Sequence, residues 1–286
     1  MNDVFDKEIN VKLRQECCPE GSLLRTLQMS QLDILIEFDR ICQKYNIDYW
    51  LDFGTLLGAE RHGGFIPWDD DIDVCMFKKD LGRFLEVAES ELKDTLKVLP
   101  ASKQFCRPWT RIVNTRQEVT RLVGQWDPEN YGKVSADEGN AISEKTENVW
   151  IDIFVAENGT LPIKRFVEKT YGKCMRRKYH LFYDGMAKYM LASVLYPFMY
   201  CLVSIVRLWC RLFHPDEFVI EYGSQFNGLR MKNEIFPLSE MCFEGHMFKV
   251  PADCGNYLER LYRNHSQIPS KEKRFSHGIK KFAILD

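Results

Sequence analysis

The sequence predicts an α+β protein in which helices pack on a mixed β-sheet and a further helical segment is inserted. Three observations predict this class. Apolar and other residues alternate with a period of two over residues 71–76, which is typical of a strand. A nearly continuous apolar run over 148–154 indicates another strand. Apolar residues recur at helical spacing over 22–45, which indicates an amphipathic helix.

The composition limits the classes of protein. The 286 residues suffice for one large domain or two small ones, and 45% hydrophobic and 28% charged residues are ordinary for a globular chain. A formal net charge of −2 gives no support for nucleic-acid binding. Ten scattered cysteines without a Cys-x-x-Cys pair predict reduced thiols and a cytoplasmic location. The first fifteen residues lack the apolar core of a secretory signal.

The expected elements follow in chain order. A turn at 19–21 precedes Ser22, the expected N-cap of the 22–45 helix. A strand over 47–53 leads into a turn at Gly54 and Thr55 and then into a short helix. The later expectations are a helix over 80–94 capped by Asp80, strands at 97–99 and 109–113, a long polar loop at 124–147, short helices and loops over 214–247, and a helix over 254–262.

Four aspartates lie within five positions: Asp69, Asp70, Asp71 and Asp73. Bunched carboxylates repel one another, so a fold keeps them only where solvent or a cation neutralises them, and Mg²⁺ prefers such oxygen ligands. On a strand, Asp71 and Asp73 point to the same side about 6.6 Å apart. They can then bind one metal ion or bridge a pair about 3.5–4 Å apart. The alternative is a solvated acidic loop.

Further candidate residues surround this cluster. Backbone N–H groups at a Gly54–Thr55 turn can hold phosphate oxygens. Arg61 suits phosphate, and His62 can hydrogen-bond a donor molecule, whereas the alternative places both in an exposed loop. Trp68 is expected to pack under the acidic turn, with a cationic head group as the alternative partner.

A single carboxylate, Asp152, interrupts the apolar run 148–154. Burying it unpaired costs several kcal/mol or changes its pKa, so we expect either a functional site or a hydrogen-bonded strand end. Arg111, in the predicted strand 109–113, is a second candidate phosphate ligand, and a surface salt bridge is its alternative role.

The stretch 49–77 resembles the signature of the LicD family, bacterial phosphocholine transferases whose eukaryotic relatives are the fukutin-type proteins. The shared elements are a Gly-Thr-Leu-Leu-Gly turn, an Arg-His-x-Gly loop and Pro-Trp-Asp-Asp-Asp-x-Asp, all within 54–73. The resemblance implies a nucleotidyltransferase-like fold with an Asp-x-Asp pair and a third carboxylate on a later strand. The family's Ile-Asp-Ile-Phe element matches 151–154, so Asp71, Asp73 and Asp152 are expected on neighbouring strands.

The resemblance also implies a reaction. A phospho-alcohol such as phosphocholine would move from a CDP-linked donor, for example CDP-choline, to a sugar hydroxyl of a cell-surface or lipid-linked glycan (lipopolysaccharide, capsule or teichoic acid). Asp71, Asp73 and Asp152 would hold Mg²⁺ or Mn²⁺, and Asp152 would take the acceptor proton. Donor contacts would come from Gly54, Thr55, Arg61, His62, Trp68 and Arg111. The alternatives are nucleotidyl transfer to a small substrate and a non-catalytic membrane-surface scaffold.

The middle of the chain predicts a helical segment with membrane-like features. Residues 162–186 are basic and helical, and 189–206 contain no charge. Three interpretations are open for 189–206: a packed helical pair, a helix lying in the membrane interface, or a membrane span. The basic flanks suit anionic lipids, so peripheral contact through 176–211 at the inner face of the cell membrane is one expectation.

Three parts are therefore expected: a nucleotidyltransferase-like core over 1–160, a basic and apolar helical segment over 161–235, and a C-terminal element over 236–286 that folds back on the core. The Val250-Pro251 pair and the helix after it resemble the family's C-terminal element, although Tyr262-Arg263-Asn264 lacks the family's glycine. The tail is basic and is expected either to line a donor or lipid-phosphate site or to be solvated; its residues are Lys271, Lys273, Arg274, His277, Lys280 and Lys281.

Overall fold

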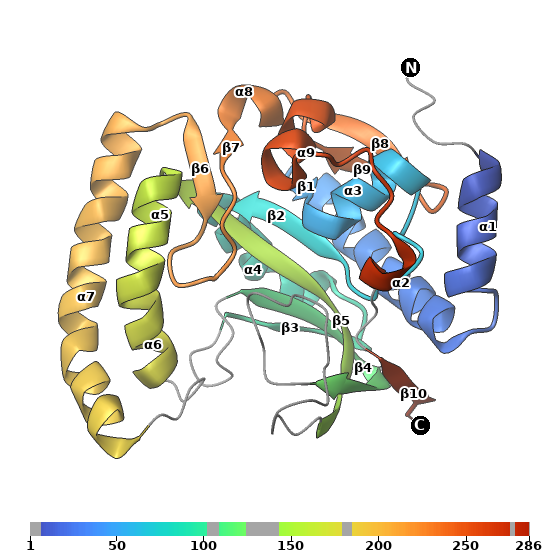
Figure 1. The fold of residues 1–286 in the computed structure, drawn as a ribbon, viewed down its shortest axis with the longest axis horizontal. Helices are drawn as coiled ribbons and strands as arrows, with labels where there is room; N and C mark the ends of the chain where they lie inside the picture. Colours follow the sequence, from blue (N-terminus) through green and yellow to red (C-terminus); the bar gives the residue numbers. More distant parts are fainter. Residues whose placement is uncertain (1–6, 102–108, 124–142, 179–184, 275–277, 286) are drawn as a thin grey trace.

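The computed structural model describes residues 7–101, 109–123, 143–178, 185–274 and 278–285, and it shows helices around a curled mixed sheet (Figure 1). The α+β class expected from the sequence is confirmed. The centre of the loop expected at 124–147 lies outside the described residues, and residues 143–147 belong to a strand.

The main sheet of the described residues has the order β1–β2–β5–β4–β10, with β3 beside β4, β6 beside β5, and β7 beside β6. Strands β2 and β5 run parallel, and the other pairs of this sheet are antiparallel. The strands are β1 (Trp50–Leu51), β2 (Asp73–Phe77), β3 (Leu96–Leu99), β4 (Thr110–Val123), β5 (Ser143–Asn158), β6 (Glu217–Ile220), β7 (Arg230–Met231) and β10 (Ile279–Ile284).

Strand β4 is longer than the sequence indicated. The prediction ended it at Asn114 and Thr115, which are residues typical of turns, and this end point is wrong. The ladder with β5 is irregular between Asn114 and Glu118 and then continues to Val123. The side chain of Asn114 accepts a hydrogen bond from the amide of Arg116, so the turn residue bends the strand and does not end it.

Two helices cover one face of the sheet, and both were predicted. Helix α2 (Leu23–Lys44) starts after Ser22, whose hydroxyl oxygen accepts from the amide of Arg25. Helix α4 (Lys78–Glu91) begins two residues before the expected cap, Asp80. The ring of Phe38 on α2 lies 4.8 Å from that of Tyr49 and 5.1 Å from that of Phe84 on α4, so aromatic contacts join both helices to the core.

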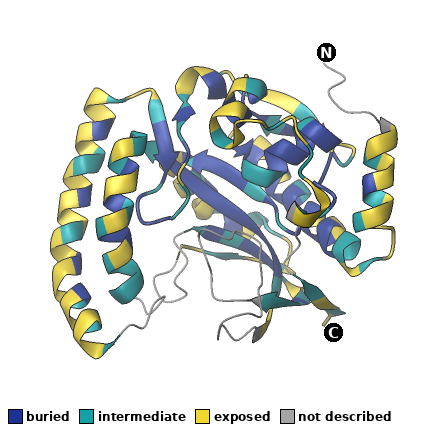
Figure 2. Ribbon diagram, viewed as in Figure 1, coloured by how far each residue is buried: buried dark blue, intermediate teal, exposed yellow. Residues whose placement is uncertain are grey.

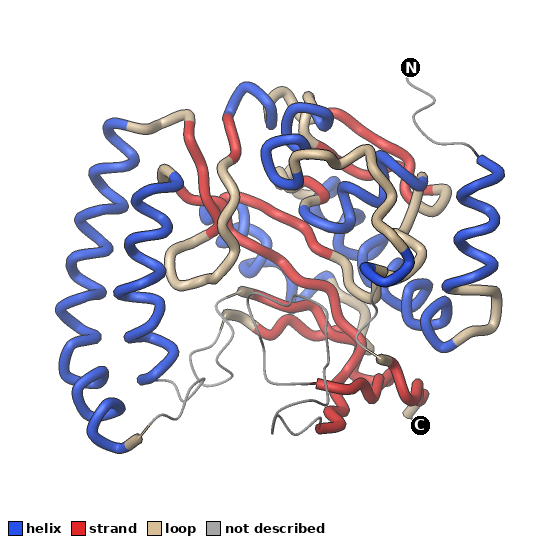
Figure 3. The backbone as a smooth tube through the Cα atoms, viewed as in Figure 1, coloured by secondary structure: helices blue, strands red, loops and turns tan. Residues whose placement is uncertain are grey.

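A two-helix arm stands beside the far end of the sheet (Figure 3). Its first limb is α5 (Leu161–Val167), the π-helical turn η1 (Glu168–Gly172) and α6 (Lys173–Lys178), and its second limb is α7 (Met186–Phe213). Helices were expected here and are confirmed. The prediction of short helices and loops over 214–247 missed β6, β7 and the hairpin of β8 (Ser239–Phe243) and β9 (His246–Val250). These strands are short and are stabilised by pairing with distant parts of the chain, so their own residues give a weak pattern.

The C-terminal part returns to the first half of the chain. Helix α9 (Cys254–Tyr262) packs on α3 (Phe53–His62), after the short α8 (Lys232–Ile235). After the 3₁₀ turn η2 (Lys271–Lys273), the backbone of β10 pairs with β4. The basic side chains of Lys271, Lys280 and Lys281 are exposed, in agreement with the alternative of a solvated tail. Helix α1 (Lys7–Cys17) was also missed, because the N-terminal residues are polar and give a weak apolar pattern.

Candidate active site

Two of the predicted acidic residues lie opposite each other near the centre of the sheet. Asp73 begins β2 and is the register partner of Asp152 on β5. The amide of Asp152 donates to the carbonyl of Ile72 at 2.8 Å, which fixes this pairing at the start of β2. In a pleated sheet, register partners place their side chains on the same face. The expectation of neighbouring strands is confirmed for Asp73 and Asp152. It is wrong for Asp71, which precedes β2.

The carboxylate of Asp152 is not unpaired. Its Oδ1 accepts from Nε of Arg111 at 2.6 Å and from the indole N–H of Trp109 at 2.7 Å. Its Oδ2 accepts from the indole N–H of Trp150 at 3.1 Å and from Nη2 of Arg111 at 3.3 Å. Each oxygen thus accepts two hydrogen bonds, so an incoming hydroxyl or cation has to displace one of these donors.

Arg111 belongs to a layered arrangement on the same face. Its guanidinium lies 4.3 Å from the centroid of the Trp150 ring, and that of Arg121 lies 4.5 Å from it. Glu147 pairs with Arg121 at 2.6 Å and with Arg111 at 3.7 Å. Burial alone would raise the pKa of Glu147, but Arg121, Arg111 and Lys145 outweigh burial and hold its pKa at about 2. Arg111 is therefore a buried ion-pair partner, and the alternative of a surface salt bridge is wrong.

The glycine and threonine of the signature lie at the start of α3. The predicted turn is wrong in detail, because Asp52 is the N-cap and both residues form the first turn of the helix. The hydroxyl oxygen of Thr55 accepts from the amide of Asp73 at 2.8 Å, so the helix start is tied to the start of β2. A Cβ on Gly54 would lie 2.5 Å from Oδ2 of Asp69, so glycine lets this carboxylate approach the helix closely.

The carboxylates of the acidic cluster act on one another. The pKa of Asp69 is raised well above its usual range by burial and by the charges of Asp71 and Asp70. The pKa of Asp73 is raised in the same way, by burial and by the charges of Asp71, Asp152 and Asp69. Asp69, Asp71 and Asp73 are each only half-buried, so solvent reaches this concentration of negative charge.

Arg61 and His62 lie in the last turn of α3 and are buried, so the alternative of an exposed loop is wrong. Nη1 of Arg61 donates to the carbonyls of His265 and Gln267, and its Nε donates to Nε2 of His62. Burial and the charge of Arg61 lower the pKa of His62 to about 3, while burial lowers the pKa of Arg61 to about 10. Around neutral pH the arginine is charged and the histidine is neutral.

Trp68 lies among cationic side chains and is half-buried. The guanidinium of Arg274 lies 5.3 Å from its ring centroid and that of Arg61 lies 6.0 Å from it. The ring of His62 is 6.1 Å away, edge on. Packing under the acidic turn, the preferred sequence interpretation, agrees with these contacts. Of the basic tail, Arg274 approaches this stretch, whereas Lys271 pairs with Glu16 on α1.

A buried network beneath α3 was missed by sequence reasoning. The fully buried Arg230 donates through Nη2 to Oδ2 of Asp52 at 2.6 Å. The hydroxyl of Tyr257 on α9 donates to Oδ1 of Asp52 at 2.9 Å and accepts from the indole of Trp50 at 2.9 Å. The Asp-x-Gly-Thr pattern contains an N-cap signal for Asp52, but no local pattern marks the partner on β7.

Carboxylate oxygen is the donor type that a hard divalent cation accepts. Half-buried carboxylate oxygens that raise one another's pKa are the ligands that Mg²⁺ or Mn²⁺ prefers, and a cation would relieve their repulsion. Among the described residues, no three His, Cys, Asp or Glu side chains already stand in a metal-binding arrangement. Asp152 in particular is held by Trp109, Trp150 and Arg111.

Known proteins match this chain over its central part and over most of its length. Residues 46–182 match the family described as LicD/FKTN/FKRP, nucleotidyltransferase domain. The lipopolysaccharide cholinephosphotransferase LicD of Haemophilus influenzae is 27% identical over 283 residues, which cover 92% of this chain and 98% of that protein.

Other known proteins match only a short part of this chain, about 50 residues long. The human ribitol 5-phosphate transferase FKRP is 39% identical over 51 residues, which are 18% of this chain and 10% of that protein. An uncharacterized protein of Rickettsia prowazekii, RP689, is 42% identical over 52 residues, which are 18% of this chain and 20% of that protein.

Proposed function

We propose that this chain, whose residues 46–182 match the LicD-type nucleotidyltransferase domain, is a phosphotransferase of that type. In this proposal it transfers phosphocholine or a close analogue from a CDP-linked donor to a sugar hydroxyl of a cell-surface glycan. The observation that carries the proposal is the placement of Asp73 opposite Asp152 beside the acidic turn. The similarity over 92% of the chain to a lipopolysaccharide cholinephosphotransferase supports the choice of substrates.

We propose that Asp71 and Asp73, with Asp69 close by, hold Mg²⁺ or Mn²⁺, and that Asp152 completes the acidic set. The metal, when bound, supplies positive charge that offsets the donor's phosphates. Phosphoryl transfer depends mainly on positioning and charge compensation, so the protein needs to do little covalent chemistry. Each acidic residue therefore contributes by its place and its charge.

Three other residues order this set. Thr55 holds the start of β2 through the amide of Asp73, and Gly54 leaves room for the Asp69 carboxylate. Arg111 holds Asp152 from two nitrogens, which makes it a positioning residue in this proposal rather than a direct phosphate ligand. Its second partner, Glu147, fixes the guanidinium from the other side.

Arg61 and His62 have a structural place in the proposal. Arg61 joins α3 to the carbonyls of the segment after α9, and His62 accepts from Arg61. Trp68 is more accessible than the buried Arg61 and His62. In the proposal it contacts the donor's head group or phosphates, together with Arg274.

The experiment is a screen of donors with purified protein. CDP-choline, CDP-ethanolamine and CDP-ribitol are offered with alkyl glycosides as acceptors, in Mg²⁺, in Mn²⁺ and in EDTA, and CMP is quantified by chromatography. CMP release that depends on the cation and on one alcohol supports the proposal. Release of pyrophosphate from a nucleoside triphosphate, with no CMP from any donor, would establish nucleotidyl transfer instead.

A further inference from the structure

The second limb of the arm presents an apolar stripe to its surroundings. On α7, side chains spaced three, four or seven residues apart are exposed, among them Phe198 at 70% and Ile205 at 65% (Figure 2). The stripe contains Leu191, Val194, Phe198, Leu202, Ile205 and Leu212. Such spacing keeps these residues on one side of a helix. Exposed apolar surface of this extent marks a contact with a membrane or a protein.

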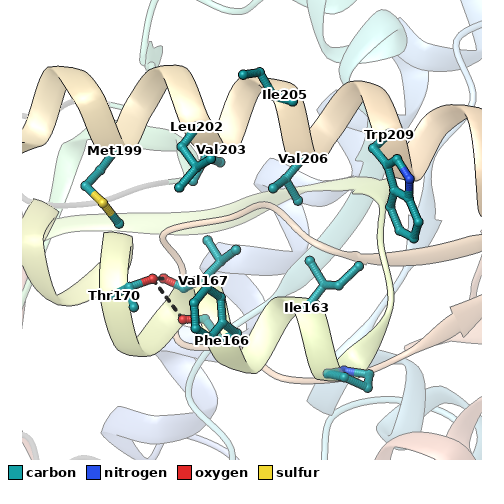
Figure 4. A pocket seen from close by; sticks show the side chains of 11 residues that line it. Ile163, Phe166, Val167, Thr170, Met199, Leu202, Val203, Ile205, Val206 and Trp209 are labelled. Carbon is teal, nitrogen blue, oxygen red and sulfur yellow. Dashed lines mark hydrogen bonds between the residues drawn. The ribbon is translucent and has the colours of Figure 1, made fainter.

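The stripe continues into a groove between α7 and α5. This cavity has a volume of about 460 Å³, and its side chains come from both helices (Figure 4). Phe166 on α5 is 65% exposed at its rim. The lining includes Ile163, Phe166 and Val167 on α5 and Leu202, Val206 and Trp209 on α7. The apolar surface thus spans two helices and is hollowed along their junction.

Sheet topology excludes a membrane-spanning role for α7 in this fold, although the helix is long and apolar enough to cross a bilayer. Residues 156–158 of β5 precede the arm and pair with residues 218–220 of β6, which follow it. A single span would place these paired strands on opposite sides of the membrane. The span interpretation of 189–206 is therefore wrong for the folded chain.

Insertion of both limbs as a hairpin is opposed by charge. The first limb carries Lys164, Arg165, Lys169, Lys173, Arg176, Arg177 and Lys178. Each charge at the centre of a bilayer costs about 2.5–3.5 kcal/mol on insertion scales. The arm can lie on a bilayer with the apolar stripe of α7 in the acyl region, but the charged first limb cannot enter the hydrocarbon core.

The same charges suit an anionic surface. Lys169 and Lys173 are exposed on the same limb as the rim residue Phe166. Lysines at this place meet lipid phosphates when the neighbouring groove rests on the acyl boundary. The cytoplasmic leaflet carries the negative surface potential that attracts such residues.

The arm is held rigidly with this face outward. The first limb contacts α7 through stacked Tyr171 and Tyr196, whose ring centroids are 5.7 Å apart. At the sheet end, Nε of Arg207 on α7 donates to Glu157 on β5 at 2.7 Å. Arg207 of α7 is thus bound to the sheet, while the apolar residues of the stripe remain exposed.

We propose that the α7 stripe and the α5–α7 groove form a docking surface for an anionic lipid bilayer, on which the arm lies in the interface plane. This inference goes beyond the proposed reaction and does not depend on it. If both hold, the catalytic carboxylates work at the membrane surface, where lipid-linked glycans are found.

The test is co-sedimentation of the full chain with vesicles of phosphatidylcholine alone and with added phosphatidylglycerol. We expect binding that increases with anionic lipid and falls with salt. Phe198→Asp and Ile205→Asp should each lower the partition coefficient at least about 10-fold, because each replaces an exposed apolar side chain that the bilayer would bury. Lys169→Gln and Lys173→Gln should each lower it about fivefold with anionic vesicles and leave phosphatidylcholine binding unchanged.

Matched controls carry the same changes elsewhere. Met247→Asp on the β8–β9 hairpin and Lys97→Gln on β3 alter exposed residues far from the arm and should leave partitioning within about twofold. Far-ultraviolet circular dichroism and thermal melting establish that each variant is folded. CMP release, measured in detergent-free solution, is read separately, so failure of the reaction and failure of binding are distinguishable.

Two results would overturn the proposal. One is equal partitioning of wild-type protein, the arm variants and the controls. The other is a dimer in sedimentation that Phe198→Asp converts to monomer while vesicles are not bound, since a second copy would then cover the stripe. Quenching by brominated lipid gives an independent reading: Trp209→Phe should remove most of the quenching, whereas Trp50→Phe, a fully buried position, should not.

Discussion

Asp73 and Asp152 occupy opposite positions on the parallel strands β2 and β5, and each is fixed by a different neighbour. Thr55 holds the backbone of Asp73, while Arg111 and two indoles hold the side chain of Asp152. One carboxylate is thereby left to respond to a ligand and the other is fixed in place. This asymmetry leads to separate predictions for the two sides of the site.

Asp73→Asn should lower CMP release by about 10²-fold or more, because it removes one charge from the cation-binding set at constant shape. The midpoint of thermal unfolding should stay equal or rise, since burial and neighbouring carboxylates already disfavour the charged form of Asp73. CMP release quantified by chromatography and a thermal melting curve make the two measurements. Wild-type turnover in the variant would remove Asp73 from the metal site.

Gly54→Ala and Gly58→Ala should separate activity from stability within one helix. A Cβ at position 54 meets the Asp69 carboxylate, so activity should fall about 10-fold while stability changes little. A Cβ at position 58 meets the backbone carbonyl of Gly64, which cannot move aside alone, so the variant should lose stability by about 1–3 kcal/mol. Urea unfolding measures stability and CMP release measures activity. Loss of stability in Gly54→Ala with loss of activity alone in Gly58→Ala would contradict these two roles.

Arg111→Lys should reduce turnover about 10- to 100-fold, because an ammonium cannot replace the two nitrogens that hold Asp152. Arg121→Lys is the matched control. The guanidinium of Arg121 lies 4.5 Å from the centroid of the same indole and pairs with Glu147, and no contact with Asp152 is found for it. Its turnover should remain within about threefold of wild type. Equal losses in both variants would indicate that the layered cluster acts only on stability.

Arg230→Met should lower the free energy of unfolding by about 3–5 kcal/mol, because it leaves the carboxylate of Asp52 buried without its charged partner. Tyr257→Phe should cost about 1–2 kcal/mol, since a single hydroxyl is lost from the same network. Lys232→Met removes the exposed pair with Asp216 and should cost less than about 1 kcal/mol. Urea denaturation followed by tryptophan fluorescence measures all three.

His62 should contribute to loss of stability in acid. Its folded-state pKa of about 3 lies below the ordinary value of 6.5, so the unfolded chain binds more protons between these limits. The contribution is complete above pH 6.5 and is lost as pH falls towards 3, because a proton on Nε2 would oppose the donor Arg61. The free energy of unfolding should therefore fall less between pH 7 and 5 in His62→Gln than in wild type. Identical slopes would contradict the neutral buried histidine.

Local sequence patterns were sufficient to predict the elements whose structure is determined by their own residues. The 22–45 helix and the juxtaposition of Asp73 and Asp152 follow from the period of apolar residues and from the family signature. The strand predicted over 71–76 is also present, but it starts at Asp73 and leaves Asp71 outside. The apolar helix near 189–206 was also predictable, but its exposure was not, since a stripe gives the same pattern against a core or a membrane.

Features that depend on distant partners could not be read from the sequence. The apolar run around Asp152 indicated that this carboxylate needs polar partners. Two of the partners, Trp109 and Arg111, come from a distant part of the chain, at and just before β4. Arg230 lies in a two-residue strand with no pattern, and its pairing with Asp52 exists only after β7 has joined the sheet. Short strands of this kind are ordered by the sheet that receives them.

The pairing of β5 with β6 brings the two roots of the arm together, and the amide of Gly159 donates to the carbonyl of Glu217 at 3.0 Å. A loop whose ends already touch can be shortened, exchanged or grafted without changing the path of the sheet on either side. The arm can therefore vary in length or surface chemistry independently of the strands that carry Asp73 and Asp152.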